Sequence, residues 1–105
     1  EHFLTKAITL IEKNLDNSEY SVEDFSQDMC MSRANLYRKI NSITDLTPSE
    51  FMRNIRLKKS AELIKEGIYP IVEIAEKVGF STHSYFSKSF KGMFGMPPSD
   101  YLKKA

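Results

Sequence analysis

Residues 71–80 spell IVEIAEKVGF, and residues 22–31, which lie 49 positions earlier, spell VEDFSQDMCM with a matching order of residue types. In both stretches apolar residues recur at steps of three and four, and a small residue, Ser26 or Ala75, occupies the fifth place. A second correspondence follows at an interval of 50, where the segment TPSEF is matched by PPSDY. The second copy therefore carries one extra residue near the start of its longer helix. The sequence predicts one structural unit that occurs twice.

Apolar residues recur at helical steps through most of the chain, so the sequence predicts an all-α protein of seven helices without strands. Ser21, Ser32, Thr47 and, in the second copy, Ser81 precede predicted helices. Their hydroxyl groups are expected to accept hydrogen bonds from the first free N–H groups. The buried stripes of the first and third helices are expected to consist of Leu4, Ala7, Ile8, Ile11, Leu15, Leu36, Ile40 and Ile43.

Each copy has a short helix, a tight turn, a capping hydroxyl and a longer helix, which is the pattern of a helix-turn-helix unit. We expect one domain over residues 1–105. Within it, the first helix-turn-helix unit is expected at 1–46, a long linker helix at 47–66 and the second unit at 67–105.

Cys30 is the only cysteine, so an internal disulfide is excluded and a reducing compartment is expected. Its position between Met29 and Met31 favours a small buried thiol. At the matching place in the second copy, Gly79 can adopt a left-handed backbone freely. Cys30 must bear strain in the same turn, or form another kind of turn.

The composition is that of a soluble globular protein, with 41% hydrophobic and 28% charged residues. No apolar run approaches the roughly 20 residues of a membrane span, and the start of the chain does not resemble a signal peptide. Because the chain begins at Glu1 rather than at a methionine, we expect it to be part of a longer protein.

Charge is distributed unevenly although the net charge is only +1. Residues 1–30 contain two lysines and seven acidic residues, a net charge of −5, whereas residues 31–60 contain seven basic and two acidic residues, a net charge of +5. A cationic patch within one domain attracts polyanions even when the whole chain is nearly neutral.

The longer helix of each copy is expected to have a polar outer face once its apolar residues face the core. At about 100° per residue, the outward positions are Arg33, Ala34, Tyr37, Arg38 and Asn41 in the first copy and His83, Ser84, Ser87, Lys88 and Lys91 in the second. Arginine can donate two parallel hydrogen bonds to guanine, and a short side chain allows contact with a thymine methyl group. A basic face is also typical of a helix that is merely solvated. A helical protein-interaction module without DNA binding is therefore the alternative.

Other function classes have little support in the sequence. There are only two histidines and one cysteine, and no acidic pair has the spacing of metal ligands, so no metal and no cofactor are expected. No nucleophile motif accompanies the serines, so the chain is not expected to be an enzyme. Phe80, Phe86, Phe90 and Phe94 recur at roughly helical steps and are expected to pack in the core rather than stack on bases.

The segment from Ile74 to Leu102, IAEKVGFSTHSYFSKSFKGMFGMPPSDYL, together with the repeat and the helix that begins at Pro48, resembles the DNA-binding domain of AraC/XylS transcription regulators. The resemblance covers residues 3–104. The segment MSRANLYRKI is most similar to the C-terminal domain of hybrid two-component regulators, in which a membrane-spanning sensor shares the chain. The resemblance implies a transcription activator whose two helix-turn-helix units enter successive major-groove segments.

By position, the resemblance assigns contacts with DNA bases to Ala34, Tyr37, Arg38, His83, Ser84, Ser87 and Lys88. It assigns contacts with DNA phosphates to Ser32, Arg33, Lys39, Asn41, Ser81 and Lys91. The expected partners are double-stranded DNA and RNA polymerase, with dimerisation through the parent protein. A cytoplasmic location is expected, with no membrane contact by this fragment, even if the parent is anchored in the inner membrane.

Overall fold

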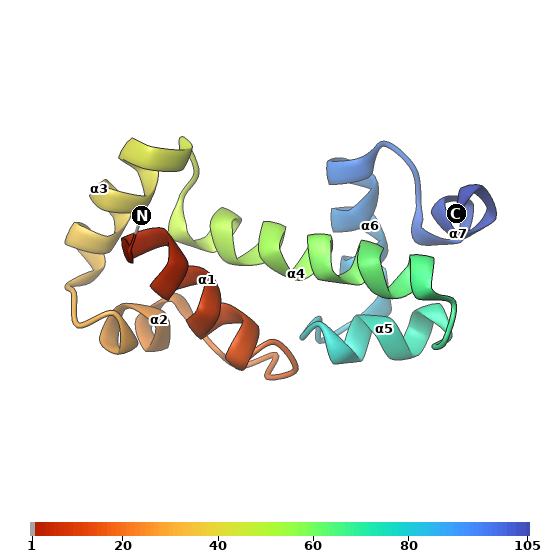
Figure 1. The fold of residues 1–105 in the computed structure, drawn as a ribbon, viewed down its shortest axis with the longest axis horizontal. Coiled ribbons are helices and arrows are strands. Elements are labelled where there is room, and N and C mark those ends of the chain that lie inside the picture. The colour runs from red at the N-terminus through yellow and green to blue at the C-terminus, as the bar shows by residue number, and fades with distance from the viewer. Residues whose placement is uncertain (1) are drawn as a thin grey trace. The chain divides into compact units, whose positions relative to one another are not determined.

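The computed structural model describes residues 2–105 and shows α-helices joined by short loops, with no strand in that range. This architecture confirms the predicted all-α fold with seven helices. The helices, drawn in Figure 1, are α1 (His2–Lys13), α2 (Val22–Asp28), α3 (Arg33–Thr44), α4 (Pro48–Glu66), α5 (Ile71–Lys77), α6 (His83–Phe94) and α7 (Pro98–Lys104). None of these seven helices is long and apolar enough to cross a membrane.

Three helices begin at the side-chain caps that the sequence predicts. Ser21 Oγ accepts a hydrogen bond from the N–H of Asp24 at 3.1 Å, and Asp24 Oδ2 accepts one from the N–H of Ser21 at 3.1 Å. Thr47 and Glu50 form the same reciprocal pair at the start of α4, at 3.1 and 2.9 Å. Ser32 caps α3 by accepting a single bond of 3.1 Å. Each cap satisfies N–H groups that the helix leaves free, which typically stabilises a protein by about 1 kcal/mol.

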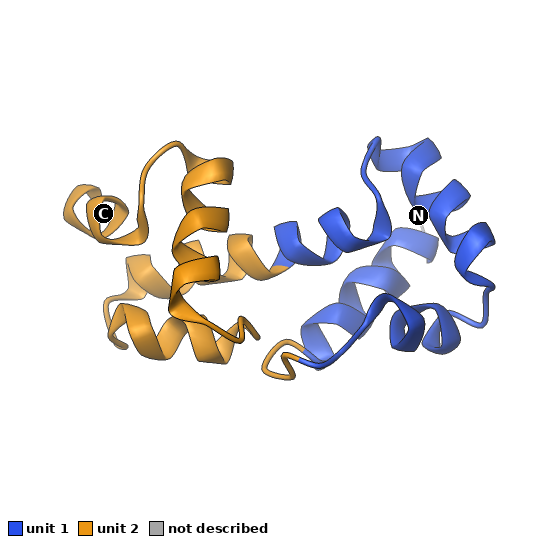
Figure 2. Ribbon diagram, turned by 180° about the vertical axis from the view of Figure 1, so that it is seen from behind, with its two compact units in different colours: residues 1–14, 19–55 blue, residues 15–18, 56–105 orange. Residues whose placement is uncertain are grey.

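The chain forms two compact units, coloured separately in Figure 2. The N-terminal unit extends to Asn14 and continues over residues 19–55, and the C-terminal unit comprises residues 15–18 and 56–105. Helix α4 contributes residues to both units. Because its apolar residues face two different cores, they do not form a single stripe along the helix. The short segment 15–18 connects α1 to α2 along the chain but belongs to the C-terminal unit.

The core of the N-terminal unit is formed by α1, α2, α3 and the first half of α4. Its buried residues are Ala7, Ile11, Tyr20, Phe25, Met29, Leu36, Ile40, Phe51 and Met52. Two residues expected in the buried stripes are not part of it, because Ile8 is 37% and Ile43 is 40% exposed. Ile8 lies at the edge of the α1 stripe, and Ile43 lies in the last turn of α3. The prediction that Leu15 belongs to the buried stripe of the first helix is also wrong. Leu15 lies beyond the end of α1 and packs against the core of the C-terminal unit.

Aromatic rings fill much of the core of the C-terminal unit. Phe86 lies between Phe80 and Phe90, with ring centroids 5.2 and 5.8 Å away, and Phe90 in turn contacts Phe94 at 4.5 Å and Tyr101 at 5.3 Å. Phe86 and Phe90 are fully buried. Such tilted and edge-to-face pairs stabilise a core beyond the burial of their area. The phenylalanines therefore pack in the core, as the sequence predicts.

The turn between the two helices of each helix-turn-helix unit has the same backbone form. Cys30 has φ 59° and Gly79 has φ 84°, so both lie in the left-handed region. The next residue in each turn then donates its N–H to the carbonyl five positions earlier, at 3.0 Å in both copies. This is the Schellman arrangement that commonly ends a helix. Cys30 therefore adopts the same turn as glycine and bears the strain of that backbone, which costs an L-residue about 1–2 kcal/mol.

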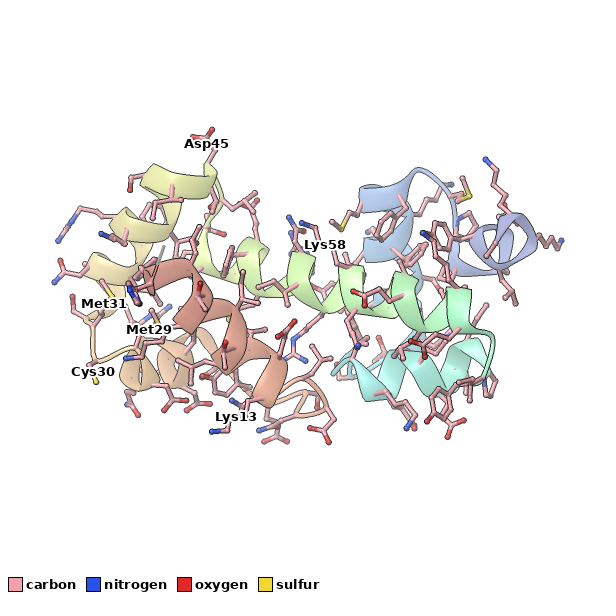
Figure 3. The ribbon with its side chains drawn as sticks, in the orientation of Figure 1. Lys13, Met29, Cys30, Met31, Asp45 and Lys58 are labelled. Carbon is pink, nitrogen blue, oxygen red and sulfur yellow. The ribbon has the colours of Figure 1, made fainter. Side chains whose placement is uncertain are left out.

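The expected burial of Cys30 is wrong. The side chain is exposed, and Figure 3 shows Cys30 in the loop between α2 and α3. Its neighbour Met29 is buried and Met31 is half-buried. In this turn the flanking residues make the apolar contacts, whereas the left-handed residue itself faces solvent.

The extra residue of the second copy lies in its turn. Thr82, and not Ser81, caps α6, because Thr82 Oγ1 accepts a hydrogen bond of 3.1 Å from the N–H of Tyr85. Thr82 follows Ser32 by 50 positions, which is the interval of the rest of the longer helix. Ser81 is therefore the inserted residue, and the expectation that it caps the helix is corrected.

A buried arginine holds the loop segment 15–18 in the C-terminal unit. Arg56 in α4 donates hydrogen bonds to the backbone carbonyls of Leu15, of Asn17 at 3.1 Å and of Val78 at 2.8 Å. Burial lowers the pKa of Arg56, although the nearby Asp16 acts in the opposite direction. An arginine stays charged even so, and three carbonyl dipoles stabilise its charge.

Candidate nucleic-acid interface

The outer surface of α3 is polar and exposed. Leu36 and Ile40 are fully buried and fix the rotation of the helix about its axis. Ala34, Tyr37 and Arg38 consequently face solvent, and the Tyr37 side chain is 48% exposed. All three residues expected to contact bases from this helix are thus accessible on one face.

Two arginines on this surface have polar neighbours. Arg33 Nε lies 3.9 Å from Glu23 Oε1 of α2, and both side chains are more than half exposed. Arg38 donates a hydrogen bond from Nη2 to the side-chain oxygen of Asn35, one turn earlier in α3. An exposed ion pair contributes little to stability. Both guanidinium groups therefore keep donors that can reach an anion.

Lys39 and Asn41 lie at the two flanks of α3 and contact their own unit. The Lys39 Nζ atom lies 5.4 Å from the centre of the Phe3 ring in α1, in a cation–π contact. Asn41 is half-buried and donates from Nδ2 to the carbonyl of Leu46 at 3.4 Å. That contact braces the loop between α3 and α4. Both residues, which are expected to contact phosphate, therefore already have a partner within the protein.

Helix α6 presents the corresponding surface in the C-terminal unit. Because Phe86 and Phe90 point into the core, the opposite face is formed by His83, Ser84, Ser87, Lys88 and Lys91. All of these are exposed except Ser87, which is half-buried. A hydrogen bond of 3.3 Å joins Ser87 Oγ to His83 Nε2, so two of the expected base-contacting groups form a pair.

Ser32 and Ser81, both expected to contact phosphate, differ in their role at the helix start. Ser32 is exposed at the start of α3, with Oγ bonded to a backbone N–H of that helix. Ser81 is exposed in the turn before α6, where Thr82 has the capping role. Thr82 was missed because the first interval of the repeat points to Ser81. The change of interval from 49 to 50 is the signal that could have identified it.

Residues 2–105 contain no group of three histidine, cysteine or acidic side chains that could hold a metal ion. The polar surfaces of α3 and α6 instead combine guanidinium, ammonium, imidazole and hydroxyl groups. These groups are suited to hydrogen bonding with base edges and phosphate oxygens.

The family model described as "Helix-turn-helix domain" matches residues 25–104, from within α2 to α7. The chain therefore belongs to the helix-turn-helix domains, a class of protein that places its second helix in the major groove of DNA.

Solved structures narrow this assignment to the AraC type. The C-terminal domain of AraT, a response regulator from Geobacillus stearothermophilus, is 30% identical over 100% of this chain and 87% of that one, with a TM-score of 0.88. A transcriptional regulator from Chromobacterium violaceum, described as containing an AraC-type DNA-binding domain, is 26% identical over 97% and 90% of the two chains, with a TM-score of 0.87. The resemblance to AraC-type regulators is thus confirmed.

Longer proteins contain a similar segment. Histidine kinase P4 of Formosa agariphila is 41% identical over 104 residues, which are 99% of this chain but 8% of that protein. The transcriptional regulators that match next are about three times as long as this chain, which spans 32% to 37% of their length.

Proposed function

We propose that this chain is the sequence-specific DNA-binding output domain of a transcription activator. In this proposal α3 and α6 enter successive major-groove segments of double-stranded DNA. The observation that carries the proposal is the outer face of α3, where Ala34, Tyr37 and Arg38 are exposed beside a fully buried apolar stripe. Membership of the helix-turn-helix family supports DNA binding over a protein-interaction module.

The side chains on the two helices differ in what they can recognise. Arg38 can donate two parallel hydrogen bonds to guanine O6 and N7, whereas Ala34 is short enough to contact a thymine methyl group. In α6, His83, Ser84, Ser87 and Lys88 would contact base edges with single hydrogen bonds. We expect α3 to supply more of the sequence specificity and α6 more of the affinity.

Phosphate contacts would surround these positions. Arg33 and Lys91 are exposed on the same faces, Ser32 and Ser81 lie next to the starts of the two helices, and Lys39 can extend from the flank of α3. Neutralising phosphates in this way releases counterions, so binding should weaken as salt increases.

The parent protein is proposed to be a hybrid two-component regulator, in which a sensor and this domain share one chain. The domain would act in the cytoplasm, recruit RNA polymerase and dimerise through the parent, which would be anchored in the inner membrane by another segment. The similarity to the histidine kinase supports this architecture, because the matched segment is a small part of that protein. Kinase chemistry would belong to other parts of such a parent.

The test compares two neighbouring cations in α3. Duplexes that bind the chain are first selected from a random pool, and affinities are then measured by fluorescence anisotropy at two salt concentrations. Arg38→Ala is expected to cost about 1–3 kcal/mol of specific binding and to relax one base position. Lys39→Ala should weaken all duplexes alike and reduce the salt slope by about one. Unchanged binding curves for both variants at both salt concentrations would contradict the assignment.

A further inference from the structure

A hollow of about 500 Å³ lies on the N-terminal unit beside α3. Its apolar wall is formed by Val22, Ala34 and Pro48, which come from the first turns of α2, α3 and α4. Pro48 is buried, and α4 begins at this proline with the reciprocal cap described above. The apolar wall of the hollow therefore consists of residues in the first turns of three helices, and the cap at Thr47 fixes the start of α4. Small-molecule sites are commonly apolar hollows of about 300–1,000 Å³.

The remaining lining is polar and contains two cations. Arg33 and Arg38 line the hollow together with the ring of Tyr37, and the hydroxyl groups of Thr47 and Ser49 complete it. The lining includes no acidic side chain among the described residues. The hollow therefore combines an aromatic face with two guanidinium groups that have no negative charge beside them in the lining.

We propose that this hollow binds a small organic anion with a flat apolar body, such as an aromatic carboxylate of two fused rings. The body would lie against Val22, Ala34 and Pro48 and stack on the exposed ring of Tyr37. The carboxylate would accept charge-assisted hydrogen bonds from Arg38 and from Arg33.

Glu23 of α2 competes with a ligand for Arg33. Glu23 lies 3.9 Å from Arg33 and is more than half exposed, so its hold on Arg33 is weak. A ligand carboxylate can therefore replace Glu23 as the partner of Arg33 at little cost. The side-chain oxygen of Asn35 occupies one donor of Arg38 and leaves the others free for the ligand.

The repeat provides an internal comparison for this site. At the positions that match Tyr37 and Arg38, the C-terminal unit has Ser87 and Lys88. At these positions the C-terminal unit thus lacks both the tyrosine ring and the planar guanidinium that the ligand needs. Ligand binding is specific to the N-terminal unit.

Occupancy of the hollow blocks DNA binding, because Ala34, Tyr37 and Arg38 are also the residues that contact bases. This consequence rests on the proposed function, whereas ligand binding itself does not. A small-molecule anion would thus act on the DNA-binding surface directly.

The experiment titrates naphthalene-2-carboxylate into the ¹⁵N-labelled chain and follows its amide resonances by NMR. Saturable shifts are expected at residues 33–38 and at Thr47 and Ser49, with a dissociation constant of about 1 mM or tighter for a ligand of this size. The neutral isostere naphthalene-2-carboxamide should bind about tenfold more weakly, because it cannot accept the charge-assisted bonds. Arg33→Gln should weaken carboxylate binding by about threefold or more.

Two matched variants separate the hollow from a general effect. Ala34→Leu fills the hollow and should weaken binding by about tenfold, whereas Ser84→Leu at the matching position of α6 should leave ligand affinity within about twofold. Both positions are exposed, so neither change should unfold the protein, and the amide spectrum reports this directly.

Each result either supports or overturns the proposal. Shifts that fail to saturate, that are equal for the carboxamide, or that survive Ala34→Leu would overturn it. In a second arm, saturating naphthalene-2-carboxylate should displace a selected duplex, and formation of a ternary complex would also overturn it. A chain that binds the ligand but no duplex would contradict the proposed function and leave the ligand site intact.

Discussion

Replacing Gly79 with alanine tests whether the buried Arg56 leaves no room for a β-carbon in the turn between α5 and α6. A β-carbon at Gly79 would overlap Nη1 of Arg56 and the carbonyl oxygen of Leu15, in addition to occupying a left-handed backbone at φ 84°. The backbone alone costs an L-residue about 1–2 kcal/mol. Forcing an extra carbon into a filled site costs about 1–3 kcal/mol. We therefore expect Gly79→Ala to lower the free energy of unfolding of the C-terminal unit by about 2–5 kcal/mol.

The chain contains a matched control for this change. Gly67 also has a positive φ, 71°, but a β-carbon there would meet no atom within 4 Å. Gly67→Ala should cost only the backbone strain of about 1–2 kcal/mol. Residue-resolved hydrogen exchange measures both effects and reports on the C-terminal unit separately from the N-terminal one.

A double-mutant cycle isolates the role of Arg56. In an Arg56→Met background the guanidinium is absent and the carbonyl of Leu15 is no longer held, so Gly79→Ala should cost about 1–2 kcal/mol, as at an open site. Equal costs of Gly79→Ala in both backgrounds, or equal costs at Gly79 and Gly67, would refute the explanation.

Three further outcomes are expected. Glu23→Gln frees Arg33 from its ion pair and should raise DNA affinity by about two- to fivefold at low salt; an unchanged affinity would mean that Arg33 does not face a phosphate. Burial, and the hydrogen bond of 2.7 Å to Asp28, raise the pKa of Tyr20 above its ordinary value of about 10. The unfolded chain then loses this proton first, so stability should fall as the pH rises above about 10, and Tyr20→Phe should flatten that fall in denaturation curves at pH 8 to 11. Cys30→Gly relieves left-handed strain but increases the freedom of the unfolded chain, so thermal denaturation should show a net stabilisation of about 0.5 kcal/mol, and a loss of stability would show that the cysteine side chain makes a contact that matters.

Features governed by neighbouring residues were predictable from the sequence. The caps at Ser21, Ser32 and Thr47 depend on a hydroxyl and the helix that follows it, so they were identified correctly. The repeat predicted the two turns, because the order of small, apolar and capping residues is itself local. Exposure of Cys30 was not predicted, since it follows from the direction in which a left-handed residue points its side chain and not from its apolar neighbours.

Features that join distant parts of the chain were not predictable. Arg56 finds acceptors 39 to 41 residues earlier and 22 residues later in the sequence, and all of them are backbone carbonyls. Every residue has such a carbonyl, so no sequence pattern identifies the partners. The hollow beside Tyr37 is formed by three helix starts, and its shape likewise depends on their packing. The cation–π contact between Lys39 and Phe3 likewise joins residues that are far apart in the sequence.

The position of residues 15–18 limits how this protein can be divided. A truncated chain that began at Arg56 would retain α5, α6 and α7 but would lack the carbonyls of Leu15 and Asn17. Its guanidinium would have lost two of three acceptors. The repeat suggests two interchangeable units. Moving the C-terminal unit into another regulator nevertheless requires residues 15–18 to be included with it.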